Sequence, residues 1–160
     1  MVKVGDKVPS ATLRTMGPEG PKPVTTEELF APGKKVVAFA LPGAFTPTCS
    51  AKHVPGFVGD YDKLKAKGVD TIACISVNDA FVMGAWGKDQ KADGKVMMLG
   101  DGNGEFTEAM GLTLDGTKNG MGKRSQRYAM IVQDGKIKDL FVEKPGTFEV
   151  SSAENVLKHL

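Results

Sequence analysis

The residue best suited to chemistry in this chain is a cysteine near the predicted start of a helix. Cys49 ends the segment LPGAFTPTC, residues 41–49, which follows an apolar run. Thr46 is a favourable N-cap, and Pro47 suits the first helical position, whose N–H needs no partner. Free backbone N–H groups and the positive end of the helix dipole favour a thiolate in such a first turn. The pattern therefore predicts a reactive thiol, although most free cysteines are small buried hydrophobes.

The other cysteine and the nearer histidine are weaker candidates. Cys74 lies in a predicted strand, where a buried and inert thiol is the first expectation. His53, four residues after Cys49, is expected to be exposed on the helix, and lining the entrance to a site is its alternative role. The two histidines and two cysteines have no recognised zinc spacing, so no metal is predicted. Thr46 stands where a Cys-x-x-Cys motif would have its first cysteine, which argues against a dithiol oxidoreductase.

Length and composition favour one ordinary globular domain over residues 1–160. The 160 residues allow a single well-buried core, and a net charge of +2 gives no reason to expect nucleic acid as a partner. The sequence has no apolar run fit for a signal peptide and none that approaches the roughly 20 residues needed to cross a membrane. A cytoplasmic location is the default expectation, with a removed targeting peptide left open.

The elements that must position Cys49 form a predicted βαβ unit. Residues 36–41 are a continuous apolar run of the kind found in a central, doubly covered strand. The helix that follows has one apolar face and ends before Gly68; that face contains Val54, Phe57, Tyr61 and Leu64. Pro55 and Gly56 are expected to bend or break this helix. Residues 69–77 form a second buried strand, parallel to the first.

The flanking segments complete a thioredoxin-like fold. Before the unit, a turn-rich surface loop at residues 17–23 is expected to divide an N-terminal hairpin-like segment from the core, and a short helical turn is expected to begin at Thr26. After it come a helix capped by Asn78 or Asp79, a strand at 95–99, and a surface turn at 101–106 before another helix. The capped helix is predicted to run through Phe81, Val82, Ala85 and Trp86. A hairpin of residues 127–132 and 136–142 turns at Asp-Gly, and a last helix is capped by Ser151 or Ser152. The expected class is α/β, with a central mixed sheet flanked by helices and extra N-terminal strands.

The segment PGAFTPTCSAKHVPGF, residues 42–57, closely resembles the active site of peroxiredoxins of the type II or peroxiredoxin-five subfamily. The resemblance continues through residues 75–82 and 127–130, so it extends over nearly the whole chain. It implies a thiol peroxidase that reduces hydrogen peroxide and small alkyl hydroperoxides without an organic cofactor. It also implies a homodimer formed near the edge of the active site.

The resemblance assigns roles to four residues. Cys49 would be the peroxidatic thiolate that becomes a sulfenic acid. Thr46 would turn its hydroxyl toward the peroxide, Pro42 would shield the thiolate from water, and Arg127 would supply a fixed positive charge. Spacing alone does not distinguish Arg127 from Arg124, and that choice rests on the resemblance.

The resemblance leaves the reductant open. In some plant-like members the cysteine matching Cys74 is regarded as the resolving partner, and in animal members a C-terminal cysteine serves. Residues 146–152 contain no cysteine here, which excludes the animal route. A Cys49–Cys74 disulfide requires Cα atoms within about 7 Å. An outside thiol, glutathione or glutaredoxin, is slightly favoured over Cys74, and thioredoxin is a further candidate.

Two other classes of function fit parts of the sequence. One is a thioredoxin-like interaction or holdase module that lacks turnover. The other is a cysteine acyl-transfer enzyme in which His53 would serve as the base for Cys49.

Overall fold

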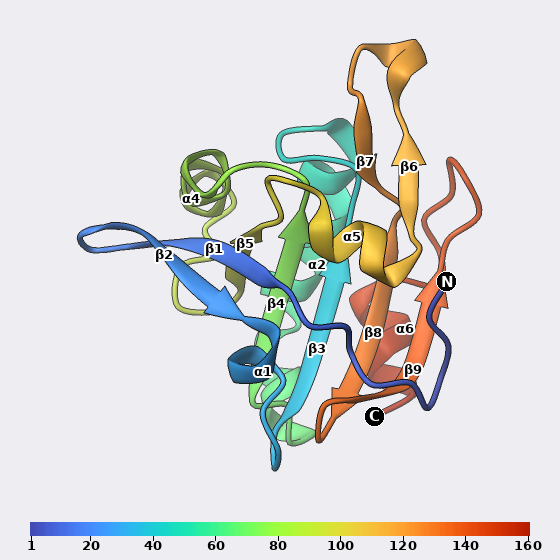
Figure 1. Ribbon diagram of the computed structural model, residues 1–160. Helices are drawn as coiled ribbons and strands as arrows, with labels where there is room; N and C mark the ends of the chain where they lie inside the picture. The colour runs from blue at the N-terminus through green and yellow to red at the C-terminus, as the bar shows by residue number, and fades with distance from the viewer.

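Seven strands form one mixed sheet that runs through the molecule (Figure 1). The structure is a computed structural model that describes residues 1–160. The strand order is β2-β1-β5-β4-β3-β8-β9, with β3, β4 and β5 parallel and the other pairs antiparallel. The strands are β1 (Thr12–Gly17), β2 (Gly20–Thr25), β3 (Lys35–Ala40), β4 (Thr71–Ser76), β5 (Met97–Gly100), β8 (Tyr128–Gln133) and β9 (Lys136–Val142).

Helices cover both faces of this sheet. In Figure 1, α5 lies in front of the strands and α6 lies behind β8. The helices are α1 (Thr26–Leu29), the π-helix η1 (Cys49–His53), α2 (Val54–Gly59), α3 (Tyr61–Ala66), α4 (Ala80–Asp89), α5 (Glu105–Met110) and α6 (Ala153–Lys158). A separate two-stranded sheet of β6 (Thr113–Asp115) and β7 (Lys123–Ser125), joined through the 3₁₀ helix η2 (Thr117–Asn119), projects at the top of the view.

Side chains of the central strands alternate between two apolar layers, as the two-residue period of a strand requires. In β3, Val37 and Phe39 point into the layer that holds Cys49 and helices α2, α4 and α6. Val36 and Ala38 point into the opposite layer with α5 and β1. The prediction that residues 36–41 form a central strand covered on both faces is therefore confirmed.

Most other predicted elements are also found. β4 is parallel to β3, Asp79 caps α4 by accepting from the Val82 N–H at 2.8 Å, and Ser152 caps α6. The β8–β9 hairpin turns at Asp134 and Gly135, whose φ angles of 54° and 76° are those of the mirror-image turn that Asp-Gly favours. Strands β1 and β2 are the N-terminal additions to the thioredoxin-like fold.

One prediction about the flanking segments is wrong. Residues 17–23 are mostly strand, because β2 begins at Gly20. Prolines are tolerated there since β2 is an edge strand, where a missing N–H leaves no ladder bond broken. Helix α4 is found where it was predicted; its side chains Met83 and Trp86 are buried in the core, whereas Phe81 is 63% exposed.

The helix after β3 also differs from its prediction. It begins at Pro47, as expected, but residues Cys49–His53 form a π-helix in which the Val54 N–H donates to the Cys49 carbonyl. Pro55 lies in the first turn of α2, where its missing N–H breaks no helical hydrogen bond. The break falls at Asp60, between α2 and α3, instead of at Pro55.

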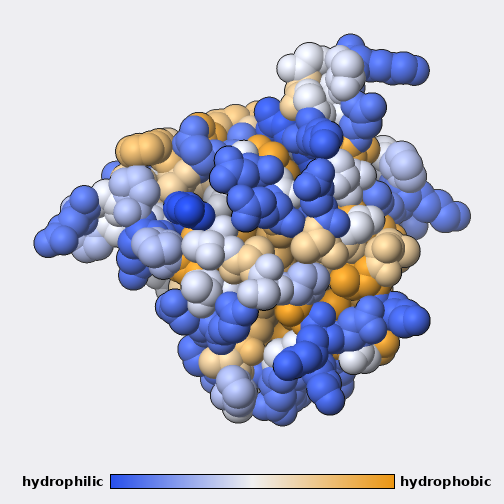
Figure 2. All heavy atoms as spheres, viewed as in Figure 1, coloured by the Kyte–Doolittle hydropathy of each residue, from blue (hydrophilic) through white to orange (hydrophobic).

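No helix in the structure has both the length and the apolar character needed to cross a membrane. Figure 2 shows hydrophilic side chains over most of the face seen in Figure 1, with apolar groups visible between them.

Candidate active site

The sulfur of Cys49 contacts the guanidinium group of Arg127. Nη2 of Arg127 donates to Cys49 Sγ at 3.1 Å. The sheet register accounts for this contact: Ala40 at the end of β3 lies opposite Tyr128 at the start of β8. The residues that follow β3 and precede β8 therefore meet at the same edge of the sheet. A fixed positive charge at this distance stabilises a thiolate. It also stabilises negative charge that moves from the sulfur to a departing group.

His53 holds the same guanidinium from its other side. Nη1 of Arg127 lies 2.9 Å from His53 Nδ1, and His53 Nε2 lies 3.0 Å from the Ser151 carbonyl oxygen. Because a carbonyl only accepts, Nε2 carries the proton and Nδ1 accepts from Arg127. Burial, together with the Arg127 charge, lowers the pKa of His53 to about 3. The imidazole is therefore neutral at physiological pH.

The prediction that His53 is exposed is wrong. Its side chain is fully buried, among the rings of Phe39, Phe57 and Phe148. The π-helical turn and the loop before α6 together enclose it. His53 thus does not line the entrance to the site but positions Arg127 from behind.

A cavity of about 480 Å³ adjoins this cluster. Pro42, Thr48, Arg127 and Phe148 contribute to its wall, and Lys52 lies on its rim. Cys49 itself is fully buried. Arg127 touches both the cavity and the sulfur, so it lies at the boundary between the cavity and the buried thiol.

Thr46 and Pro42 lie on the loop that leads to Cys49. Thr46 Oγ donates to the Gly43 carbonyl at 2.7 Å and makes no capping bond with a helix N–H. The side-chain capping role predicted for Thr46 is therefore wrong, although the helix starts at the predicted residue. The loop closes on itself through this hydroxyl. Pro42 lines the cavity.

Arg124, which the sequence could not separate from Arg127, has a different position. Its Nε donates to the Met121 carbonyl at 2.9 Å, and its Nη1 lies 3.4 Å from the Pro42 carbonyl. A Cβ placed on Gly43 would lie only 2.7 Å from this Nη1. Arg124 thus braces the loop before Cys49 without contacting the sulfur, and no sequence signal pointed to that role.

The residues around the Cys49 turn link it to α4. Trp86 Nε1 donates to Ser50 Oγ at 3.0 Å, and the ring of Phe45 lies 6.3 Å from the ring of Trp86. Phe45 has a φ of 63°, a left-handed conformation that is strained for an aromatic residue, and it is 54% exposed.

Cys74 lies in β4 opposite Phe39, in the same apolar layer as Cys49. Both thiols are free and buried. Burial, reinforced by the neighbouring Cys49, raises the pKa of the Cys74 thiol well above its ordinary value. Cys74 is therefore a protonated core thiol in this conformation.

The thioredoxin-like sheet and the cysteine–arginine contact at its edge define a class of protein, the thiol-dependent oxidoreductases. No three side chains among His, Cys, Asp and Glu lie together as metal ligands would.

Comparison with known proteins identifies the family. The Redoxin family model matches residues 3–157. Over 99% of its length the chain is 54% identical to chloroplastic Peroxiredoxin-2E of Arabidopsis thaliana, of which it covers 69%, and 47% identical to Peroxiredoxin-2B of the same plant, of which it covers 98%. A crystal structure of reduced Prx3 from Vibrio vulnificus in complex with hydrogen peroxide superposes with a TM-score of 0.95, at 53% identity over 99% of both chains. The chain belongs to the Redoxin family and is a peroxiredoxin, a thiol peroxidase.

Proposed function

We propose that Cys49 is the peroxidatic residue. Its thiolate attacks one oxygen of the hydroperoxide, the O–O bond breaks, and the other oxygen leaves as water or alcohol after taking up a proton. Cys49 becomes a sulfenic acid. The 3.1 Å contact between Arg127 Nη2 and Cys49 Sγ is the observation that carries this proposal. During the attack, negative charge moves from sulfur to the departing oxygen, and a guanidinium fixed beside both stabilises the transition state.

Pro42 and Thr46 would act around this centre. Pro42 lies in the cavity wall near the thiol and would limit access of water. The Thr46 hydroxyl donates to the Gly43 carbonyl, which leaves its oxygen lone pairs to accept from the peroxide O–H.

An outside thiol, glutathione with or without glutaredoxin, would restore the enzyme. A first glutathione displaces water from the sulfenic acid and forms a mixed disulfide, and a second releases Cys49 and oxidised glutathione. The cavity beside Arg127 has a volume in the range of small-molecule sites, and its rim carries Lys52 and Lys144. Both lysines are exposed and neither forms an ion pair, so they are free to bind the two carboxylates of glutathione.

Resolution by Cys74 is the less favoured route. A resolving cysteine attacks as a thiolate, and the raised pKa of Cys74 keeps it protonated. Cys74 is also held in a central strand between β3 and β5, so a disulfide with Cys49 would require the Cys49 turn to unwind or the strand to move.

The surroundings of His53 argue against an acyl-transfer enzyme. A base for Cys49 needs a free nitrogen lone pair facing the sulfur. In His53, Nδ1 is occupied by Arg127 and Nε2 by the Ser151 carbonyl.

We also propose that the protein forms a homodimer at the edge near the active site. Phe45 and Phe81 are exposed there, 54% and 63%, on the loop before Cys49 and at the start of α4. Sedimentation of the wild type and of a Phe45→Ala, Phe81→Ala double variant tests this: a dimer that dissociates in the variant supports it, and a monomeric wild type refutes it.

The chemical roles are tested by peroxide consumption coupled to glutathione reductase. Cys49→Ser should be inactive, and Cys74→Ser should keep its activity with glutathione. A mass spectrum after one equivalent of peroxide should show a sulfenic acid, or a glutathione adduct when glutathione is present. An intramolecular disulfide, or loss of activity in Cys74→Ser, would overturn the outside-thiol route.

The glutathione site has its own test. Lys52→Glu and Lys144→Glu should each raise the KM for glutathione, because a carboxylate would then face a carboxylate. Lys118→Glu, which changes an exposed lysine on η2, should leave that KM unchanged. Equal KM values in all of these variants would exclude the cavity rim as the binding site.

A further inference from the structure

The segment between β9 and α6, residues 144–151, supports the Cys49 site from one side. The Phe148 ring lies 5.9 Å from the Arg127 guanidinium carbon and 5.1 Å from the His53 ring. The Ser151 carbonyl accepts from His53 Nε2. This segment therefore completes the pocket in which Arg127 and His53 are held.

The carboxylate of Glu143 organises this segment. Its Oε2 accepts from the Ser151 N–H at 2.9 Å, the Ser151 hydroxyl at 2.7 Å and the Glu149 N–H at 2.7 Å. Its Oε1 accepts from the Thr147 hydroxyl at 3.2 Å. Glu143 is only 6% exposed and forms no ion pair. The Glu143 carboxylate has no cationic partner and makes several hydrogen bonds to one loop. These hydrogen bonds fix the conformation of the loop.

These hydrogen bonds keep Glu143 ionised. Burial alone opposes the charge, but the donors from Ser151 and from the backbone outweigh it, and the pKa of Glu143 lies below its ordinary value. All four bonds need the carboxylate to accept, and the ionised form supplies that at neutral pH.

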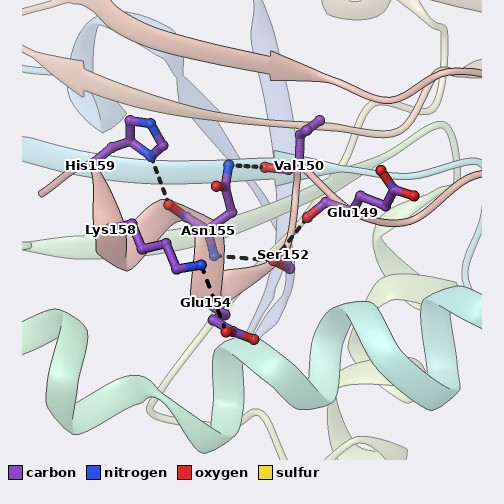
Figure 3. A network of polar contacts seen from close by, with 7 residues as sticks. All are labelled: Glu149, Val150, Ser152, Glu154, Asn155, Lys158 and His159. Carbon is purple, nitrogen blue, oxygen red and sulfur yellow. Dashed lines mark hydrogen bonds and ion pairs between the residues drawn. The ribbon is translucent and has the colours of Figure 1, made fainter.

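The far end of the segment is held by the start of α6 (Figure 3). Ser152 Oγ donates to the Glu149 carbonyl at 3.1 Å and accepts from the Asn155 N–H at 3.1 Å, and Asn155 Nδ2 donates to the Val150 carbonyl at 2.7 Å. These contacts involve residues 149–155 only. Thr147 has no bond to α6, and its single hydroxyl proton is shared between Glu143 Oε1 at 3.2 Å and the Lys144 carbonyl at 2.8 Å.

Hydrogen bonds connect Glu143 to Arg127 by two routes, one through the backbone and one through side chains. The backbone N–H of Glu143 donates to the Arg127 carbonyl at 3.0 Å. The carboxylate of the same residue holds Ser151, whose carbonyl holds His53, and His53 accepts from the guanidinium that contacts Cys49.

We propose that Glu143 is a positioning residue for Arg127, acting through Ser151 and His53 on a guanidinium that it does not touch. The inference rests on the proposed roles of Cys49 and Arg127. Small displacements of a catalytic group cost up to about 100-fold in rate, so the conformation of this loop is part of what sets the peroxidase rate.

The test measures the rate at which pre-reduced enzyme reacts with hydrogen peroxide. Glu143→Ala should lower that rate constant about 10- to 100-fold. Glu143→Gln, which keeps one accepting oxygen, should fall between Glu143→Ala and wild type, and it also serves if Glu143→Ala does not fold. Glu149→Gln is the matched control, because the exposed Glu149 side chain makes no contact with the loop's polar groups, and it should react like wild type.

A double-mutant cycle with Arg127→Gln separates positioning from general support of the fold. If Glu143 acts through Arg127, removing its carboxylate should cost little further rate once the guanidinium is gone. An equal fold-loss in both backgrounds, or a Glu143→Ala variant as fast as wild type, would overturn the proposal.

The same cycle distinguishes this inference from the proposed function. If Arg127→Gln reacts as fast as wild type, the proposed role of Arg127 in catalysis is wrong. Any loss of rate in Glu143→Ala then has a cause other than Arg127, which overturns the inference about Glu143 as well. A slow Arg127→Gln combined with additive effects leaves the role of Arg127 standing and overturns only the inference about Glu143.

Discussion

The neutral, buried state of His53 makes the stability of the protein depend on pH. In the folded protein the pKa of His53 is about 3, against an ordinary value of 6.5. Between these values only the unfolded chain takes up a proton at this residue, so acidification favours unfolding. The stability that His53 contributes is complete above about pH 6.5 and is lost as the pH falls toward the folded-state pKa.

The size of the effect follows from the gap between the two pKa values. Each pH unit inside that window removes about 1.4 kcal/mol from the free energy of unfolding. From about pH 7.5 to about pH 5 the loss through His53 amounts to about 2 kcal/mol, because only 1.5 units of that range lie below 6.5.

Urea unfolding at the two pH values measures this loss in wild type and in His53→Gln. Glutamine is a fair comparison, because its amide can accept from Arg127 and donate to the Ser151 carbonyl without titrating. Carboxylates titrate in both proteins, so the difference between the two pH-dependent losses isolates His53. A loss as large in His53→Gln as in wild type would refute the assignment of a neutral, buried imidazole.

Two further substitutions test the site and the fold. At 3.1 Å and an effective dielectric constant of about 20, a full charge on Cys49 and the Arg127 charge attract by about 5 kcal/mol, an upper bound on what the contact supplies. Loss of one such positioned donor costs about 100-fold or more, so Arg127→Gln should slow the reaction with peroxide by that factor, while the exposed Arg14→Gln should not; similar rates in both variants would contradict the mechanism. Gly135→Ala should lower the free energy of unfolding by about 1 kcal/mol, because Gly135 has a φ of 76° and a Cβ there would lie 3.4 Å from the Phe30 carbonyl oxygen; an unchanged urea midpoint would count against this turn.

The parts of the fold that were predicted correctly have strong local signals. The apolar run of β3, the Asp-Gly turn between β8 and β9, and the caps Asp79 and Ser152 each depend on a few neighbouring residues. The π-helix at Cys49–His53 has no comparable signal, and neither does the face that α4 turns to the core. Both depend on how segments distant in sequence pack together.

The site residues also divide into those with a local sequence signal and those without one. Cys49 is recognisable from its place after a strand and at a helix start. Arg127 reaches the sulfur only because β3 and β8 pair at one sheet edge, so the residues alone could not select it, and the family resemblance did. His53 was predicted to be exposed because the loop that buries it comes from the far end of the chain. Glu143 looks like any surface carboxylate until that loop is folded around it.

The hydrogen bond between Trp86 and Ser50 gives the molecule a natural optical probe. Trp86 is the only tryptophan in the chain, and its indole N–H is bonded to the residue next to Cys49. Any unwinding that carries the oxidised sulfur toward a reductant must break this bond and alter the environment of the indole. The emission of the unlabelled protein should therefore report, within a single turnover, whether the active-site turn is wound or open.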